Sequence, residues 1–194
     1  MEKREILKQL LVKHSVDLKE VILSSGKKSN YYIDGKMVST TPEGAPIIAD
    51  LVKEMIGTTD IDAVGGPTIG ADPILGALAG KGYYRTFIIR KEPKKHGSRK
   101  WIEGQLKEED RRVVIVDDVA TTGGSILRAI DTLKKVVPQI EVMKVIVLVD
   151  REEGAKEKLE ARGYRLESIF KAKELVEAKK QQEGIGNKCR AAAA

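Results

Sequence analysis

Val113-Val-Ile-Val-Asp-Asp-Val-Ala-Thr-Thr-Gly-Gly-Ser125 is the most informative stretch of this 194-residue chain. Its first four residues are β-branched, which is typical of a buried parallel strand. The strand leads into Asp117 and Asp118, and residues 120–125 form a turn of small residues before an amphipathic helix. A turn at a helix N-terminus directs backbone N–H groups at a phosphate, and paired carboxylates can accept hydrogen bonds from vicinal sugar hydroxyls. The stretch therefore predicts a ribose phosphate site.

A tight strand-to-helix turn whose acids only cap the helix is the plain alternative. The order of strand, paired acids, two threonines, two glycines and helix favours the phosphate site. The turn is not a Walker A loop, because no Gly-Lys-Ser/Thr follows four residues after a glycine. The stretch 25–29 also fails that test, since Val21 holds the place of the required glycine.

The composition is that of a folded basic protein. Hydrophobic residues make up 41% of the chain and its formal net charge is +6, which favours anionic partners such as a polyphosphate. Aromatic residues are few, and no RNA-recognition signature is present. The single cysteine, Cys189, excludes a disulfide framework. No stretch approaches the ~18–20 apolar residues of a membrane span, and the N-terminus has no signal-peptide core. We expect a cytoplasmic protein with neither nucleic-acid nor membrane partners.

Strands and helices alternate along the chain. Predicted strands cover residues 61–65, 85–90, 112–116, 142–149 and 164–169, with two shorter ones within 21–33. Predicted helices cover residues 2–13, 42–57, 70–80, 125–136, 153–162 and 171–182. This alternation predicts an α/β fold, a parallel sheet flanked by helices. The loops 65–71, 90–104, 117–125 and 150–154 should converge at the carboxyl ends of its strands.

The loop from Arg90 to Lys100 holds six cations and a histidine in eleven residues. Such a run is often only a solvated loop. Here it leaves the same edge of the sheet as the phosphate turn, and structureless loops of this length are usually functional. Cations brought in by a closing loop would stabilise negative charge that develops during a reaction at this edge.

Residues 117–125 resemble the phosphoribosyl pyrophosphate (PRPP) motif of the type I phosphoribosyltransferases. The resemblance implies the fold of that family, with Asp117 and Asp118 on the ribose hydroxyls. It also implies that the rest of the motif cradles the 5′-phosphate: Val119, Ala120, Thr121, Thr122, Gly123, Gly124 and Ser125. We expect one domain over 1–190, with a small N-terminal hood subdomain (1–40), a core (41–170), a C-terminal helix (171–190) and a tail (191–194).

Arg90 to Gly97 resembles the mobile catalytic loop of the orotate-using members of this family, Arg-Lys-Glu-x-Lys-x-His-Gly. The match implies that Arg90, Lys91, Lys94 and His96 are catalytic and contact the pyrophosphate. It also implies a homodimer in which loop residues reach the neighbouring subunit's site. Residues 98–104 differ from the acidic, glycine-rich continuation that the family often has.

Three further segments resemble parts of the same site. Residues 25–32 are similar to a segment whose aromatic residues flank the orotate ring, which implies a role for Tyr31 and Tyr32 and leaves a plain hairpin as the alternative. Arg151 matches the position that pairs with the orotate carboxylate, and Thr121 is assigned to the same site. Residues 65–73 resemble the pyrophosphate-binding loop, with Ile69-Gly70 where many members have Tyr-Lys.

Together these resemblances imply transfer of a phosphoribosyl group from PRPP to N1 of orotate. They imply Mg²⁺ bound to PRPP, with no direct protein ligand predicted for the metal. Two alternatives stay open: a phosphoribosyltransferase for another base such as a purine, and a regulator that keeps the fold and binds RNA. The first is not expected to combine the Arg90–His96 loop with Arg151. The second has no need of cations for a leaving group.

Overall fold

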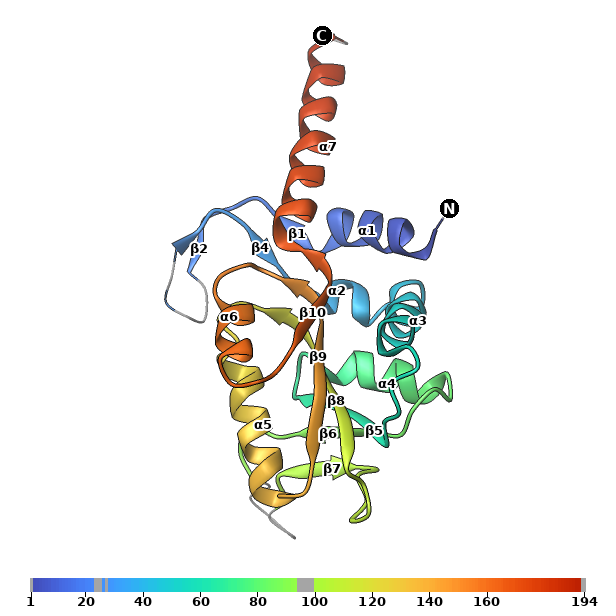
Figure 1. Ribbon diagram of the computed structural model, residues 1–194. Helices are drawn as coiled ribbons and strands as arrows, with labels where there is room; N and C mark the ends of the chain where they lie inside the picture. Colours follow the sequence, from blue (N-terminus) through green and yellow to red (C-terminus); the bar gives the residue numbers. More distant parts are fainter. Residues whose placement is uncertain (1, 23–25, 27, 94–99, 193–194) are drawn as a thin grey trace.

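The strand that carries the two acids, β8 (Arg112–Ala120), lies inside a six-stranded sheet (Figure 1). A computed structural model of the chain describes residues 2–22, 26, 28–93 and 100–192. The strand order is β10-β9-β8-β5-β6-β7. The other strands are β5 (Ala63–Pro67), β6 (Thr86–Ile89), β7 (Ile102–Gly104), β9 (Glu141–Asp150) and β10 (Leu166–Lys171). All neighbouring strands are parallel except β7, which runs antiparallel to β6 at the edge.

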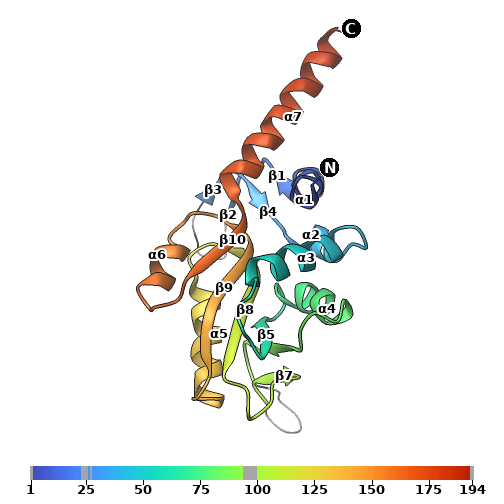
Figure 2. The same ribbon diagram turned by 45° about the vertical axis from the view of Figure 1, so that its right-hand side comes forward.

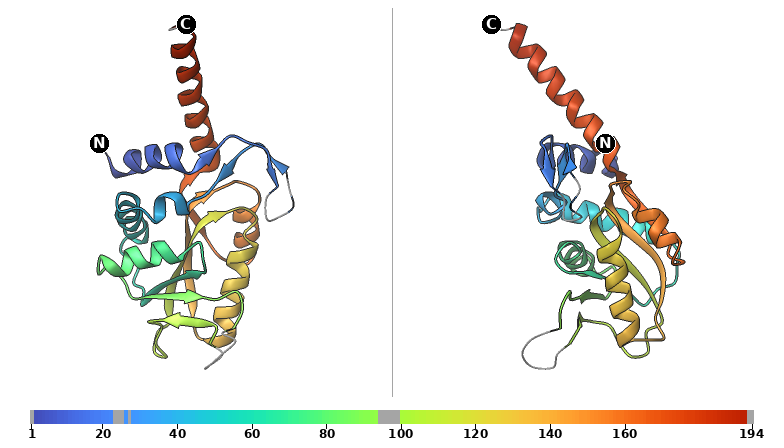
Figure 3. Two further views of the ribbon diagram at one scale, coloured as in Figure 1. Left: turned by 180° about the vertical axis from the view of Figure 1, so that it is seen from behind. Right: turned by 90° about the vertical axis from the view of Figure 1, so that its left-hand side faces the viewer.

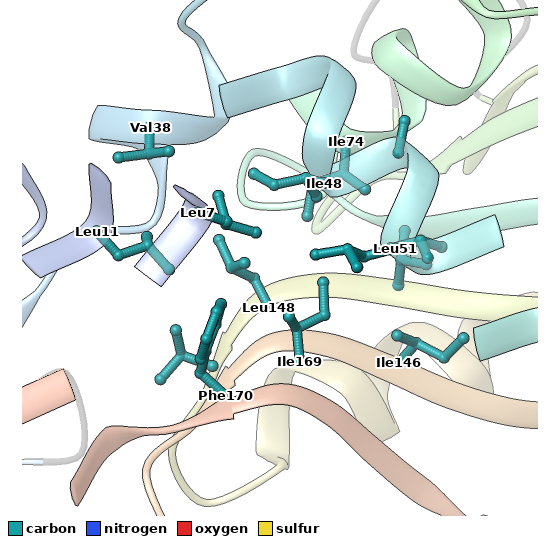
Figure 4. Close-up of a cluster of buried hydrophobic side chains, with 14 of the residues drawn as sticks. Leu7, Leu11, Val38, Ile48, Leu51, Ile74, Ile146, Leu148, Ile169 and Phe170 are labelled. Atoms are coloured by element: carbon teal, nitrogen blue, oxygen red, sulfur yellow. The ribbon is translucent and has the colours of Figure 1, made fainter. Parts of the chain in front are cut away.

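Alternate residues of β8 face two hydrophobic layers. Val114 and Val116 belong to the layer under α3 (Gly44–Ile56) and α4 (Asp72–Gly80). Val113 and Ile115 belong to the layer under α5 (Gly124–Val136) and α6 (Ala155–Glu160). Figure 2 shows these two pairs of helices on opposite sides of the sheet. In the first layer, the labelled side chains Ile48, Leu51 and Ile74 of the helices point toward Ile146 and Leu148 of β9 (Figure 4). Burial of each such aliphatic side chain contributes roughly 1.5–3 kcal/mol.

The β8 strand is longer than the sequence predicted. Residues 112–116 were expected to form it, but pairing with β9 continues until Ala120 lies opposite Asp150. Asp117 and Asp118 are therefore part of the strand and do not follow it. The physical reason is the length of β9, whose ten residues offer β8 partners along its whole length.

An N-terminal segment lies over the carboxyl ends of β9 and β10 (Figure 1). It consists of α1 (Lys3–His14), β1 (Val16–Asp17), β2 (Val21–Ile22), β3 (Lys28–Ser29), β4 (Tyr32–Ile33) and α2 (Lys36–Ser39). β1 pairs with β4 and β2 with β3, both antiparallel. This segment corresponds to the region expected to form the hood, although its boundary at residue 40 stays a prediction.

Several predicted boundaries differ from the observed ones. α3 begins at Gly44 and not at Pro42, because Thr41 Oγ1 accepts a hydrogen bond from Gly44 N (3.0 Å) and starts the helix there. The short elements α2 and β7 were not predicted, since four and three residues carry too little periodicity. Among the described residues, no helix is both long and apolar enough to cross a membrane.

The C-terminal helix α7 (Ala172–Ala192) is longer than the expected 171–190 segment and includes the first residues of the expected tail. Its first turns pack on the core through Ala172, Leu175 and Val176. Beyond them, the helix projects from the body of the molecule in every view (Figures 1 and 3).

Candidate active site

The phosphate turn joins the end of β8 to the start of α5. Gly123 has a φ of 71°, a left-handed conformation that glycine adopts without steric cost, and α5 begins at the next residue. The first helical hydrogen bond runs from Leu127 N to Gly123 O (3.0 Å), so the N–H groups before Leu127 have no partner within the helix. Together with the helix dipole, these groups form an anion-binding site.

Asp117 and Asp118 lie side by side just before this turn, and both are buried. Asp117 Oδ1 accepts a hydrogen bond from Asp118 N (2.9 Å), and Asp118 Oδ1 accepts one from Val119 N (2.8 Å). Burial, together with the neighbouring charge of Asp118, raises the pKa of Asp117 well above its usual range. Two acids held this close, with few donors of their own, are suited to accept hydrogen bonds from a ligand.

The loop after β5 lies directly against the two acids. A Cβ on Gly70 would lie 2.4 Å from Asp118 Oδ1 and 2.6 Å from Asp117 Oδ1, so only glycine permits this approach. Thr68 N donates to Ile89 O (3.0 Å) at the end of β6, and Thr68 Oγ1 donates to Asp72 Oδ2 (2.8 Å). The backbone of this loop therefore reaches the acids and the start of the cation-rich loop together.

Arg151 lies on the other side of the phosphate turn, because its backbone N donates to Ala120 O (2.9 Å). Its side chain is 2% exposed. Arg151 Nε donates to Glu153 Oε1 (2.8 Å) and Nη2 to Ser29 Oγ (3.0 Å), while the guanidinium lies 4.3 Å from the centroid of the Tyr31 ring. Among the described residues, the Nη1 edge of the guanidinium has no partner, which leaves part of its fork for a carboxylate.

Tyr31 and Tyr32 differ in their relation to this arginine. Tyr31 is half-buried against Arg151, and burial raises the pKa of its phenol in spite of the opposing arginine charge. Tyr32, in β4, is 40% exposed, and no described contact joins it to Arg151. The sequence proposed both tyrosines for the base site, and the structure brings only Tyr31 to Arg151.

The base of the cation-rich loop is closed by a hydrogen bond from Arg90 N to Trp101 O (2.9 Å). The Arg90 side chain faces acceptors at that base, with Nε donating to Glu92 O (3.3 Å) and Nη1 3.9 Å from Glu103 Oε1. The charge of Lys91 acts on Asp117, whose pKa it lowers against the larger effect of burial. Lys94 and His96 lie outside the described residues.

Comparison with known proteins agrees with this geometry. A family model described as a phosphoribosyl transferase domain matches residues 34–177. The chain is 44% identical to the orotate phosphoribosyltransferase of Pyrococcus furiosus over 178 residues, which cover 91% of this chain and 96% of the relative. The chain belongs to the orotate phosphoribosyltransferases.

Two further orotate phosphoribosyltransferases support this assignment. The one from Aquifex aeolicus is 40% identical, over 91% of this chain and 99% of its own length. The crystal structure of the Mycobacterium tuberculosis orotate phosphoribosyltransferase in complex with PRPP has a TM-score of 0.75 and 32% identity, and it covers 90% of this chain and 99% of that one. The predicted family and fold class are therefore confirmed.

The sequence missed two charged residues of this orotate phosphoribosyltransferase site. Lys36, at the start of α2, lies next to Asp118, and Glu153 holds Arg151. Glu153 could have been found as an acid two residues from the arginine. Lys36 is 82 positions from its partner, and its only signal is its place just after the tyrosine segment.

Proposed function

We propose that the chain transfers the 5-phosphoribosyl group of PRPP to N1 of orotate, giving orotidine 5′-phosphate and pyrophosphate. The observation that carries this proposal is the hydrogen bond between Arg151 N and Ala120 O, which sets a buried arginine beside the phosphate turn. A ligand anchored by its phosphate in that turn would have its C1 carbon near a base whose carboxylate faces Arg151. The reaction serves pyrimidine synthesis.

In this proposal the phosphate turn and the two acids hold PRPP still. The N–H groups at the start of α5 and the hydroxyls of Thr121, Thr122 and Ser125 bind the 5′-phosphate. Asp117 and Asp118 accept hydrogen bonds from the ribose hydroxyls. The relative from Mycobacterium tuberculosis, crystallised in complex with PRPP, supports PRPP as the substrate class.

Displacement at C1 breaks the bond to pyrophosphate and forms the bond to N1 of orotate, through a centre with oxocarbenium character and with inversion. Orotate needs no general base, because its N1 is acidic enough to react as the anion. Carboxylates near the ribose favour the positive charge that develops on the ring. Backbone N–H groups of the Gly65–Ala71 loop meet the departing pyrophosphate.

The loop cations complete the proposal. Arg90, Lys91, Lys94 and His96 would neutralise the pyrophosphate charge, and loop closure would exclude water from the reacting centre. Arg90 would have to leave Glu92 and Glu103 to do so. We further propose a homodimer in which this loop serves the neighbouring subunit's site, and a cytoplasmic location.

The site also fits Mg²⁺ brought in on PRPP. Mg²⁺ usually keeps several waters and binds through one or two carboxylates together with substrate phosphates. The described residues contain no cluster of three or more metal-binding side chains, but Asp117 and Asp118 form such a carboxylate pair. They would face the metal through the ribose hydroxyls. When bound, the metal would neutralise pyrophosphate charge.

A substrate panel tests the function directly. Orotate, uracil, hypoxanthine and xanthine are each supplied with Mg-PRPP, and pyrophosphate release is measured. We expect turnover with orotate alone, because uracil lacks the carboxylate that Arg151 would bind. Turnover of a purine base in preference to orotate would overturn the proposal. Tight RNA binding with steep salt dependence and no turnover would instead favour the regulator.

A further inference from the structure

Lys36 connects the N-terminal segment to the ribose acids. Its Nζ lies 2.7 Å from Asp34 Oδ1 and 3.4 Å from Asp118 Oδ2. Asp34 Oδ1 also accepts a hydrogen bond from Lys36 N (3.0 Å), so one carboxylate holds both the backbone and the ammonium of this lysine. The ammonium therefore has a fixed anchor in its own segment and a second partner in β8.

The backbone around Lys36 is pressed against the same acid. A Cβ on Gly35 would lie 3.1 Å from Asp118 Cβ and 3.3 Å from Leu148 Cδ2. The segment 34–36 therefore packs on Asp118 from one side, while Gly70 of the pyrophosphate loop packs on it from the other. Asp118 is therefore packed between the backbone at Gly35 and the backbone at Gly70, and the partners of its two oxygens set the orientation of its carboxylate.

The two oxygens of Asp118 have different partners. Oδ1 accepts from Val119 N (2.8 Å) and lies against Gly70, whereas Oδ2 faces Lys36. Burial opposes the charge of Lys36, but the hydrogen bond to Asp34 and the charge of Asp118 outweigh it and raise the pKa of the lysine. Lys36 is thus a cation held between the carboxylates of Asp34 and Asp118, and Asp118 is one of the two acids predicted to bind the ribose hydroxyls.

We propose that Lys36 is a positioning residue that orients Asp118 for the ribose diol of PRPP and thereby couples the N-terminal segment to the ribose site. The proposal rests on the function proposed above. Lys36 acts through Asp118, so removal of the lysine should weaken the binding of PRPP and leave the contacts to orotate intact. A lysine that only ties the N-terminal segment to the core would change stability without changing PRPP affinity.

Calorimetric titration of the full chain with Mg-PRPP tests the proposal. Lys36→Met keeps the aliphatic stem and removes the charge, and we expect the Kd for PRPP to rise about tenfold or more, the loss of one charge-assisted hydrogen bond. Lys36→Arg keeps the cation and should recover most of the affinity. Lys19→Met is the matched control, because Lys19 pairs with Asp17 in the same segment, is 58% exposed and does not contact the acids.

Two further measurements separate positioning from other roles. In an Asp118→Asn background, Lys36→Met should change PRPP affinity by less than about twofold, because its route of action is already gone. A full additional loss there would show direct contact with PRPP and overturn the proposal. In steady-state kinetics of Lys36→Met, the KM for PRPP should rise while the KM for orotate stays constant.

The outcomes distinguish this proposal from the proposed function. A wild-type chain that does not bind Mg-PRPP would overturn the function. A wild-type chain that binds it while folded Lys36→Met binds it equally well would overturn only the role of Lys36. Thermal melting of each variant without ligand checks that the affinities compare folded proteins.

Discussion

At the amino end of β8, Asp110 is buried against Arg85, whereas at the carboxyl end Asp117 is buried against a second acid, Asp118. Asp110 receives two hydrogen bonds from Arg85 (2.8 and 3.0 Å) and one from Lys107 N (2.8 Å). Burial opposes the charge of Asp110, but these bonds outweigh it and lower the pKa of the carboxyl. Both oxygens of this carboxylate are hydrogen-bonded, and its charge is paired, within the chain.

The acids at the carboxyl end of β8 receive fewer hydrogen bonds than Asp110 does. Asp117 and Asp118 receive one backbone hydrogen bond each, and the pKa of Asp117 is raised by burial and by its neighbour. β8 is therefore preceded by an acid that is paired with an arginine, whereas its carboxyl end carries two neighbouring acids, of which Asp118 is also bonded to Lys36. Such local instability is common at functional sites, where stability and activity compete.

The largest expected effect comes from the loop that would bring positive charge to the carboxyl end. We expect Lys94→Ala to lower kcat by about 10²–10³ while the chain stays folded, because the cation would stabilise charge that develops only as pyrophosphate leaves. Lys100→Ala is the control, an exposed lysine beyond the residues that match the catalytic loop. Steady-state rates with saturating orotate and Mg-PRPP measure both, and an unchanged kcat for Lys94→Ala would remove the loop from the reaction.

The next effect concerns the acids themselves. We expect Asp118→Asn to lower kcat/KM for PRPP by about a hundredfold, since a neutral amide accepts weaker hydrogen bonds from the ribose hydroxyls and no longer attracts the Lys36 ammonium by its charge. Asp131→Asn, an exposed acid on α5 that pairs with Arg162, serves as the control and should be active. Equal kcat/KM values for the two variants would show that the carboxyl end is not the ribose site.

The amino end should respond in stability and not in activity. Asp110→Asn leaves Arg85 facing an amide, and we expect the free energy of unfolding to fall by about 2 kcal/mol. The neighbouring Glu109→Gln is the control, because Glu109 is 72% exposed and its ion pair with Lys107 is long, at 3.7 Å. Urea unfolding measures the loss, and kcat should stay at the wild-type value. A fall in kcat while the protein is fully folded would contradict this prediction, because it would show that the amino end of β8 also affects the reaction.

The sequence predicted the carboxyl end better than the amino end. A phosphate turn is a local feature, so the order of residues along the chain is enough to predict it. Asp117 and Asp118 were predicted as part of the same stretch. The pair Arg85–Asp110 and the pair Lys36–Asp118 join positions that are 25 and 82 residues apart, and no periodicity relates them. Contacts of this kind come from how helices and strands pack, which is decided by the whole chain.

The same reason explains why the sequence could not distinguish Tyr31 from Tyr32 and why it ended β8 too early. A tyrosine pair after the Ser25–Ser29 turn gives no sign of which ring faces Arg151, because successive residues of an extended segment point to opposite sides. The length of β8 depends on β9, which follows it by a whole helix. Local pattern located the site, whereas pairing decided which of its side chains meet.

The smallest effect, and the one that compares both ends in one experiment, is the pH dependence of stability. Asp110 has a lowered pKa, so its contribution is present above the unfolded value of about 4 and is lost as the pH falls through the folded pKa. Asp117 has a raised pKa, so its folded state prefers the proton, and stability is lost as the pH rises from about 4 through the folded pKa.

The two asparagine variants should therefore diverge from the wild type in opposite directions. Below pH ~4 the Asp117 carboxyl is protonated in both states, and Asp117→Asn should unfold with nearly the wild-type free energy. As the pH rises, only the wild type carries the cost of ionising a buried acid beside Asp118, so the variant becomes the more stable of the two. The loss of stability in Asp110→Asn should instead be largest at neutral pH and shrink in acid.

Urea unfolding at several pH values between 3 and 8 measures both differences. A constant difference for Asp117→Asn across that range would mean that Asp117 ionises as easily in the folded chain as in the unfolded one, and the contrast between the two ends of β8 would then rest on geometry alone.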